Sequence, residues 1–364
     1  MNISTLSVLE DPRSTKNRRY STESLLLIIF SSVVSGYHTV DDMLAFAYAQ
    51  IEWLRKYVDL HRVPSYETLR FFLCCVKPDV LVSLFQDFIS SQDLNHNCDV
   101  IAIDGKTMRG TANSKSSALH ILSAWSTEHG LTLGMMESAG KKNEIKTIPE
   151  LVKSLNVKNA ILTTDAMGCQ KTIVKAIRES KNDYVLQVKG NQKTLLEDIK
   201  EMYEYGINSE TFHLEKSEFE QTEKGHGRIE QRKYTQFELN HDLISSLNEW
   251  QDLKTAIRVE RTRIINGAET SQISWYISSL PLGAEQAAKA VRSHWGVENN
   301  LHWSLDVILR EDDYRLYSGF GPLNMAILKR FAKNLLEKLP GKTLKRRMIG
   351  CALNDSIREQ ALFG

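Results

Sequence analysis

The chain has 364 residues, of which 42% are hydrophobic and 25% are charged, and its formal net charge is only +1. This composition is typical of a soluble protein, and the length predicts two or three domains of roughly 100–200 residues each. No apolar run approaches the ~18 residues of a membrane-spanning helix, so we expect no membrane segment. The polar first residues, which lead into a basic stretch, also predict no secretory signal peptide.

The cysteines and the local distribution of charge indicate more about the environment and the binding partners of the protein than the net charge does. The five cysteines are odd in number and lack C-x-x-C spacing, which argues against a disulfide framework and against a cysteine zinc site. We therefore expect a reducing, cytoplasmic setting. Residues 314–364 hold ten Lys or Arg against three Asp or Glu. Such an excess of positive side chains can bind the phosphate backbone of a nucleic acid, or it can form an ordinary helix face that is exposed to solvent.

The first quarter of the chain has helical patterns. Val40–Tyr57 carries apolar residues at helical spacing, and Ser21 and Ser65 stand where the first residue of a helix needs a cap. We therefore predict a helical N-terminal domain over residues 1–97.

A strand pattern begins near Cys98. The predicted order is strand, strand, strand, helix, strand, helix, strand, which favours an α/β fold with a mixed sheet flanked by helices. The expected strands are Asp99–Asp104, Leu119–Ser126, Leu131–Ser138, Asn159–Thr164 and Asp183–Val188, and the expected helices are Asn143–Leu155 and Cys169–Ser180.

The second half of this domain is more irregular. A helix over Thr194–Tyr205 precedes a β-rich insertion at about residues 207–280, and one long helix is expected over Ala284–Trp303. Further helices in residues 314–364 form a basic C-terminal part. We expect one catalytic domain over residues 98–364.

Three carboxylates are candidates for catalysis. Asp104 and Asp165 each follow an apolar run that predicts a strand, and Glu298 lies on the long helix. Sites form at the carboxyl ends of strands in open α/β sheets, so the two aspartates could share a metal and the helix could bring Glu298 to a second one. Mg²⁺ prefers such oxygen ligands, and paired ions are the usual means of attacking a phosphodiester. Each residue taken alone is more often a turn, a cap or a solvated helix residue.

A rival site uses His294, Glu298 and His302, whose i, i+4, i+8 spacing places them on one helix face. Zinc accepts imidazole and carboxylate ligands, but we rank zinc below magnesium because the two aspartates are hard oxygen donors. The histidines could instead contact DNA phosphates or flank the glutamate. We also expect this helix to pack on the sheet through Val291 and Trp295, which predicts a buried Trp295.

Other polar groups follow the same sheet or lie in the insertion. Lys189-Gly190-Asn191-Gln192 could present an ammonium and amides to a phosphodiester, or could form a simple turn. His226-Gly227-Arg228 has a glycine between two cationic groups, which allows close backbone approach. For Arg292 the default role is a salt bridge. The residues that we expect to contact DNA are Lys106, Lys189, Asn191, Gln192, His226, Arg228, Arg292, His294 and His302.

These motifs in this order resemble the DDE transposases of bacterial insertion sequences, in particular the branch that includes the H-repeat-associated proteins. The resemblance covers nearly the whole chain. Related branches carry a tyrosine and an arginine before the glutamate and a lysine after it, where this chain has Val291, His294 and Leu305. The motifs that carry the resemblance are Asp104-Gly105-Lys106, Thr164-Asp165-Ala166-Met167, Lys189-Gly190-Asn191-Gln192, His226-Gly227-Arg228 and His294-Trp295-Gly296-Val297-Glu298-Asn299.

The resemblance implies an RNase H-like core with a β-rich insertion between the second aspartate and the glutamate. It implies that Asp104, Asp165 and Glu298 hold two Mg²⁺ ions, with Mn²⁺ as a substitute, and that the protein cuts and joins DNA at transposon ends. The implied partners are transposon-end DNA, target DNA and a second copy of the chain, in a nucleoid-associated setting. The alternatives are an inactive or domesticated DNA-binding protein and a metal-dependent nuclease that does not join DNA.

Overall fold

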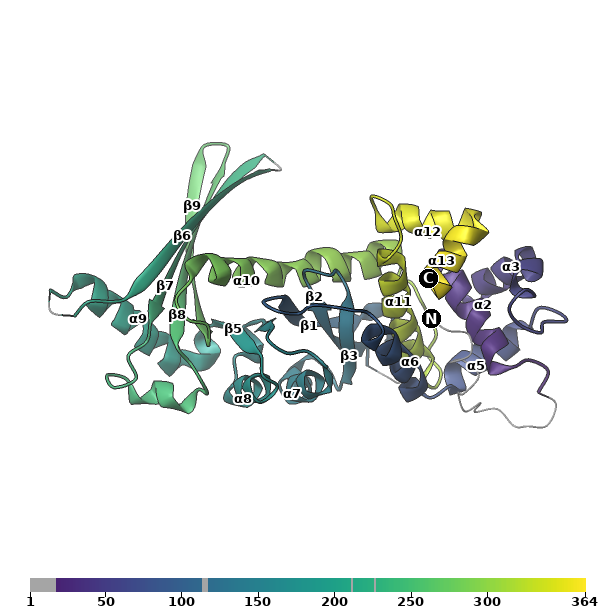
Figure 1. The fold of residues 1–364 in the computed structure, drawn as a ribbon, viewed down its shortest axis with the longest axis horizontal. Coiled ribbons are helices and arrows are strands. Elements are labelled where there is room, and N and C mark those ends of the chain that lie inside the picture. The colour runs from purple at the N-terminus through teal and green to yellow at the C-terminus, as the bar shows by residue number, and fades with distance from the viewer. Residues whose placement is uncertain (1–17, 113–116, 211, 226) are drawn as a thin grey trace.

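The computed structural model describes residues 18–112, 117–210, 212–225 and 227–364. Figure 1 shows an elongated molecule with a body of helices at one end, a central sheet covered by helices, and a long β-ribbon at the other end. Among the helices in the described ranges, none combines the length and the apolar character that a bilayer crossing needs.

The central strands form one mixed sheet, as predicted. β1 (Val100–Met108) pairs antiparallel with β2 (Leu119–Ser126), and β2 pairs antiparallel with β3 (Thr132–Ser138). On its other side β1 runs parallel to β4 (Ile161–Thr164), which runs parallel to β5 (Asp183–Val188). The parallel strands end at one edge of the sheet, which is where the candidate site lies.

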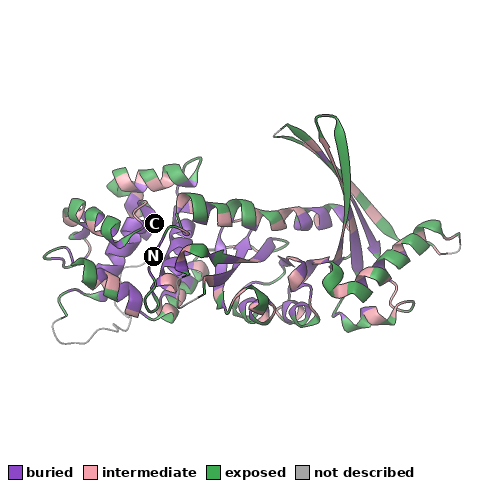
Figure 2. Cartoon of the chain, turned by 180° about the vertical axis from the view of Figure 1, so that it is seen from behind, coloured by how far each residue is buried: buried purple, intermediate pink, exposed green. Residues whose placement is uncertain are grey.

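The insertion extends this sheet and does not form a separate one. β9 pairs antiparallel with β5, so the strand order continues as β5-β9-β8-β7-β6. Figure 2 shows that the far ends of these strands are exposed, whereas their bases are buried against the core. After α9 (Lys193–Asn208), the insertion comprises β6 (Lys216–Gly225), β7 (Arg228–Glu238), the short turn η5 (Ser245–Glu249), β8 (Thr255–Ile265) and β9 (Ala268–Ser278).

Side-chain alternation along β1 sends its residues to two different layers. Ile101 and Ile103 join the core under α7 (Glu144–Ser154) and α8 (Lys171–Glu179). On the opposite face, Ala102 packs against the long helix that carries Glu298. Figure 1 shows this helix crossing the sheet from the ribbon to the helical body.

The long helix extends beyond the predicted range and changes its winding. α10 (Ala284–Gly296) is α-helical, whereas η6 (Val297–His302) and η7 (Ser304–Ile308) are π-helical. The prediction of a buried Trp295 is wrong, because 49% of this residue is exposed. A Cβ atom at Gly296 would lie 2.7 Å from the Trp125 ring, so the close approach to the sheet occurs at Gly296 and the neighbouring Trp295 faces outward.

The helical body contains the N-terminal helices together with the last helices of the chain. Ser21 and Ser65 cap their helices as predicted, accepting hydrogen bonds from the Ser24 and Thr68 amides. The expected helix over residues 40–57 is interrupted at Gln50. The helices are α2 (Thr22–Val34), α3 (Val40–Ala49), α4 (Ile51–Leu54), α5 (Tyr66–Cys75), α6 (Pro78–Ser90), α11 (Gly321–Glu337), α12 (Leu344–Leu353) and α13 (Asp355–Phe363).

α11 forms the centre of this body. Its Phe331 contacts the rings of Phe30, Phe85 and Phe88, so helices from both ends of the chain share one core. The predicted domain boundary at residue 97 falls in the connection between α6 and β1 and stays a prediction. Part of the predicted basic character of the C-terminal region is internal, because four of its cations are buried: Lys329, Arg330, Lys333 and Arg358.

Candidate active site

Asp104 and Asp165 occupy matching positions on neighbouring parallel strands. Ile103 pairs with Thr164 in the last parallel pair of β1 and β4, and the two aspartates are the next residues on each strand. The prediction that β1 ends at Asp104 is wrong, because β1 continues to Met108 in its ladder with β2. Asp104 therefore projects from the middle of a strand, where the pairing on one side holds its backbone.

The Asp165 side chain begins a short helical turn. Its Oδ1 accepts hydrogen bonds from the amides of Met167 and Gly168, at 3.0 and 3.2 Å. Two predicted DNA-contacting residues support this turn from the end of β5: the Asn191 amide donates to the Ala166 carbonyl at 2.8 Å, and the Gln192 amide donates to the Cys169 carbonyl. Asn191 and Gln192 thus fix the loop that carries Asp165.

Electrostatics link Asp104 to the other two carboxylates. Burial, with a further contribution from the negative charges of Asp165, Glu144 and Glu298 and against a lowering effect of the Gly105 amide, raises the pKa of Asp104 to about 7. That amide donates to Asp104 Oδ1 at 2.9 Å. Asp104 therefore lies in a field of uncompensated negative charge, which is the environment that a cation would neutralise.

Glu298 lies at the start of the π-helical segment. The residues on either side of this turn are anchored: Val297 and Leu301 are buried with Ala102 and Trp125. Glu298 itself is exposed. π-turns within helices occur often at functional sites, because the wider turn changes which side chains face the neighbouring layer.

The two histidines on this helix contact the aspartate strands rather than each other. His294 Nδ1 lies 3.0 Å from Thr163 Oγ1 on β4, and His302 Nδ1 lies 3.6 Å from Asp104 Oδ2. Burial lowers the pKa of His294 to about 4 and that of His302 to about 3. Both rings are therefore neutral near pH 7 and leave the aspartate charge unpaired.

Neither candidate metal set is closely gathered in this structure. Within the described ranges, the one group of three His, Cys, Asp or Glu residues whose ligand atoms all lie within 4.8 Å is at another place, the start of β1. The rival zinc set of His294, Glu298 and His302 does not meet that distance, and the three carboxylates do not meet it either.

Lys106, a predicted DNA contact, is buried among three acidic side chains that follow Glu298 in the chain. Its ammonium lies 2.7 Å from Asp306, 3.3 Å from Asp312 and 3.4 Å from Glu311. Burial alone would lower the pKa of Lys106, but Glu311 and Asp306 raise it. In this structure Lys106 joins β1 to the end of the Glu298 helix.

The remaining predicted DNA contacts are spread along the molecule. Lys189 is exposed at the end of β5, at the same edge of the sheet as Asp165. The Arg292 guanidinium lies 3.4 Å from Glu223, and Arg228 lies 3.0 Å from Glu230 near the tip of the β6–β7 hairpin. His226 lies outside the described residues.

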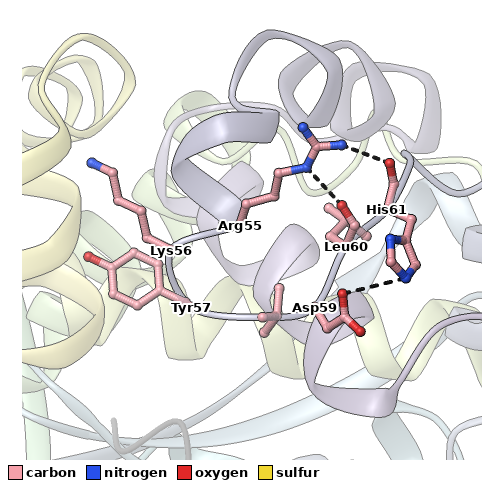
Figure 3. A pocket seen from close by; sticks show the side chains of 7 residues that line it. Arg55, Lys56, Tyr57, Asp59, Leu60 and His61 are labelled. Atoms are coloured by element: carbon pink, nitrogen blue, oxygen red, sulfur yellow. Dashed lines mark hydrogen bonds and ion pairs between the residues drawn. The ribbon is translucent and has the colours of Figure 1, made fainter.

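Two cavities differ in their relation to the carboxylates. One, of about 490 Å³, is formed by the loop after α4, where Arg55 donates to the carbonyls of Leu60 and His61 (Figure 3). The other, of about 1040 Å³, borders the Glu298 helix at Asn299 and Trp303. Its lining includes five cations, Arg310, Lys333, Lys342, Lys345 and Arg347. The lining also includes Glu128 and Glu337, and Glu337 pairs with Lys333 and Arg347.

Comparison with protein families matches this arrangement. A family model described as "Transposase DDE domain" matches residues 97–335, a range that contains all three carboxylates. A second model, described as "DDE_Tnp_1-associated", matches residues 3–89. The chain belongs to the DDE transposase family. The resemblance seen in the sequence and the RNase H-like fold that it implied are therefore confirmed.

Curated relatives of this transposase extend over almost its whole length. "H repeat-associated putative transposase YhhI" and "Putative protein YbfL", both of Escherichia coli strain K12, are each 33% identical over 99% of this chain and 97% of their own. "Putative transposase YncI" of Escherichia coli O157:H7 is 32% identical over 98% of this chain and 93% of its own. A transposase acts on DNA, so DNA is the substrate that family membership implies.

One buried pair next to Asp104 and Gly105 was not predicted from the sequence. His120 Nε2 lies 2.6 Å from Glu144 Oε1, and His120 Nδ1 lies 2.8 Å from Thr107 Oγ1. A Cβ atom at Gly105 would collide with both His120 and Glu144. The signal in the sequence was Gly105 itself, because a glycine within a strand often marks close approach of another group.

The raised pKa of Asp104 gives a pH-dependent prediction for the transposase without metal. Asp104→Asn keeps an oxygen for the Gly105 amide but removes the buried charge. In the parent protein, the Asp104 carboxyl binds its proton more tightly in the folded state, where its pKa is about 7, than in the unfolded state. The stability from this proton is fully present below the unfolded value of ~3.9 and is lost as pH rises through ~7.

We therefore expect the stability advantage of Asp104→Asn over the parent to be larger at pH 8 than at pH 5, by up to about 3 kcal/mol. Denaturant unfolding in EDTA measures this difference. Asp313→Asn, at a side chain that is 63% exposed, is the control and should show no such change with pH. An advantage of equal size at both pH values would contradict the assignment to Asp104.

Proposed function

We propose that this chain is an active DNA transposase that cuts and joins DNA at insertion-sequence ends, with Asp104, Asp165 and Glu298 as its catalytic carboxylates. The observation that carries the proposal is the position of Asp104 beside Asp165, each directly after the last parallel pair of β1 and β4, with the pKa of Asp104 raised by burial and by the charges of Asp165, Glu144 and Glu298. A structural salt bridge would lower that pKa, whereas these acids have no cation among themselves.

The donor set fits the divalent metal that transposases of this family generally use. All three side chains offer hard carboxylate oxygens, which suit Mg²⁺, or Mn²⁺ in its place. In this proposal Asp104, Asp165 and Glu298 hold two ions. Bound there, the ions would supply Lewis-acid stabilisation of the reacting phosphodiester.

The residues around the carboxylates have supporting roles in this proposal. His294 and His302 stay neutral near pH 7, so they do not neutralise the acids. Asn191 and Gln192 hold the Asp165 turn in place. Water would hydrolyse the phosphodiester at the element end, and the freed 3′-hydroxyl would then displace a 3′-oxygen in target DNA.

In this proposal, exposed lysines at two places in the molecule would contact DNA phosphates. Lys189 is exposed at the strand edge, and the large cavity next to Trp303 is lined by Lys342 and Lys345. Phosphate contacts of this kind make binding strongly dependent on salt. We further propose that the helical region over residues 1–97 recognises the element ends and that a homodimer pairs two ends.

The test is a strand-transfer assay with the purified full chain and labelled DNA that carries the ends of its own element. Parallel reactions contain Mg²⁺, Mn²⁺ or EDTA, and a substrate with scrambled ends is the control. Joined product that requires both the metal and the authentic ends supports the proposal. Cleavage without joining would identify a nuclease, and specific binding without either reaction would identify a DNA-binding protein.

A further inference from the structure

Three metal-binding side chains meet where the chain passes from the helical body into the sheet. His96 and Asp99 lie just before β1, and His129 lies in the turn between β2 and β3. Their candidate ligand atoms all lie within 4.8 Å of one another. Because β1 rises about 3.3 Å per residue, Asp99 lies roughly 16 Å along the strand from Asp104. This cluster is therefore separate from the catalytic carboxylates.

Asp99 is fixed at this place by hydrogen bonds to both of its carboxylate oxygens. Its side chain is 0% exposed, and it accepts hydrogen bonds from the Ser126 hydroxyl at 2.5 Å and the Glu128 amide at 3.2 Å. The His129 amide donates to the same Ser126 oxygen at 3.1 Å. One hydrogen-bond network through Ser126 therefore holds both the Asp99 carboxylate and the His129 backbone in place.

The hydrogen bond of His129 defines which ring nitrogen is available. His129 Nε2 lies 2.9 Å from the Asn95 carbonyl oxygen, which can only accept, so Nε2 carries the proton and Nδ1 has a free lone pair. Metal-bound histidines usually have this arrangement, with the second ring nitrogen donating to a backbone carbonyl. The His96 ring lies at 88° to the His129 ring, 5.4 Å away, and its Nδ1 lies 3.3 Å from Asp99 Oδ2.

We propose that His96, Asp99 and His129 bind one divalent cation of the zinc class. Two imidazole nitrogens and one carboxylate oxygen are a zinc donor set, with water in the fourth position, whereas Mg²⁺ prefers oxygen ligands throughout. The cation would join the α6–β1 connection to the β2–β3 turn. α11 already holds that turn, because Lys333 Nζ donates to the Gly130 carbonyl at 2.9 Å. The site is structural and independent of the proposed reaction.

The test measures metal retention by the full chain, freed of purification tags and stripped of metal. Zinc is added in the presence of excess Mg²⁺, which occupies oxygen-only sites, and bound zinc is counted by mass spectrometry after dialysis. We expect about one zinc per chain, and Co²⁺ in its place should give the visible absorption bands of a four-coordinate site. His129→Gln and His96→Gln should each weaken binding at least about tenfold.

The matched control is His61→Gln, at a side chain that is 91% exposed, which should leave zinc binding unchanged. Folding of every variant is checked by circular dichroism. A measurement on the parent chain avoids substitution altogether: zinc should protect His96 and His129, but not His61, from diethyl pyrocarbonate. Absence of retained zinc, equal retention by the His96 and His129 variants, or equal modification with and without zinc would overturn the proposal.

Discussion

Asp165→Asn is expected to abolish DNA cleavage and joining while leaving the fold intact. Both backbone hydrogen bonds to this side chain use Oδ1, and asparagine keeps that oxygen. The substitution replaces only the second oxygen, and with it the negative charge. Because Lewis-acid stabilisation by a bound metal is worth several kcal/mol, its loss should slow both steps by about a thousandfold or more.

The strand-transfer assay with Mg²⁺ measures this loss, and circular dichroism and gel filtration verify the fold of the variant. Asp313→Asn is the matched control, since Asp313 is exposed and its partner is the surface residue Arg310. That control should retain the parent rate. Joining by Asp165→Asn at a rate within tenfold of the parent would exclude Asp165 from the catalytic set.

Arg330→Met is expected to give the largest loss of stability. Arg330 and Glu311 form an ion pair with 0% exposure on either side, at 2.6 Å, and Arg330 Nε also donates to Ser123 on β2. Removing the guanidinium leaves a buried carboxylate whose nearest other cation is Lys106, at 3.4 Å. Breaking a buried pair in this way costs about 3–5 kcal/mol.

Denaturant unfolding of the two proteins at one pH measures the change in the free energy of unfolding. Arg310→Met breaks an arginine–aspartate pair at the surface and should cost at most about 1 kcal/mol. Arg330→Met/Glu311→Leu removes both buried charges and should recover part of the stability. A double variant less stable than Arg330→Met would show that packing, not charge, accounts for the loss.

The sequence predicted the core strands and helices well because their apolar periodicity is local. The predicted ranges Leu119–Ser126 and Asp183–Val188 match β2 and β5. It failed at the end of β1, where Gly105 and Lys106 are unusual strand residues. Gly105 is needed by the His120–Glu144 pair, and Lys106 is held by carboxylates some 200 residues away, from Asp306 onward.

The three candidate carboxylates stay a prediction from the sequence, and the geometry around them could not be predicted. Glu298 was placed on a helix of ordinary winding, whereas it lies in a π-helical segment that the apolar periodicity does not indicate. Trp295 was expected to pack on the sheet, but the close approach occurs at Gly296, against Trp125 from a distant strand. The cluster of His96, Asp99 and His129 was missed for the same reason, since His129 approaches the other two only through strand pairing.

The continuous sheet has a mechanical consequence. β5 is hydrogen-bonded to β4 on one side and to β9 on the other, so the long exposed ribbon and the strand preceding Asp165 belong to one ladder without a hinge. We therefore expect a protein or DNA that binds the ribbon tip to influence the turn that carries Asp165 through the β5–β9 and β4–β5 pairings.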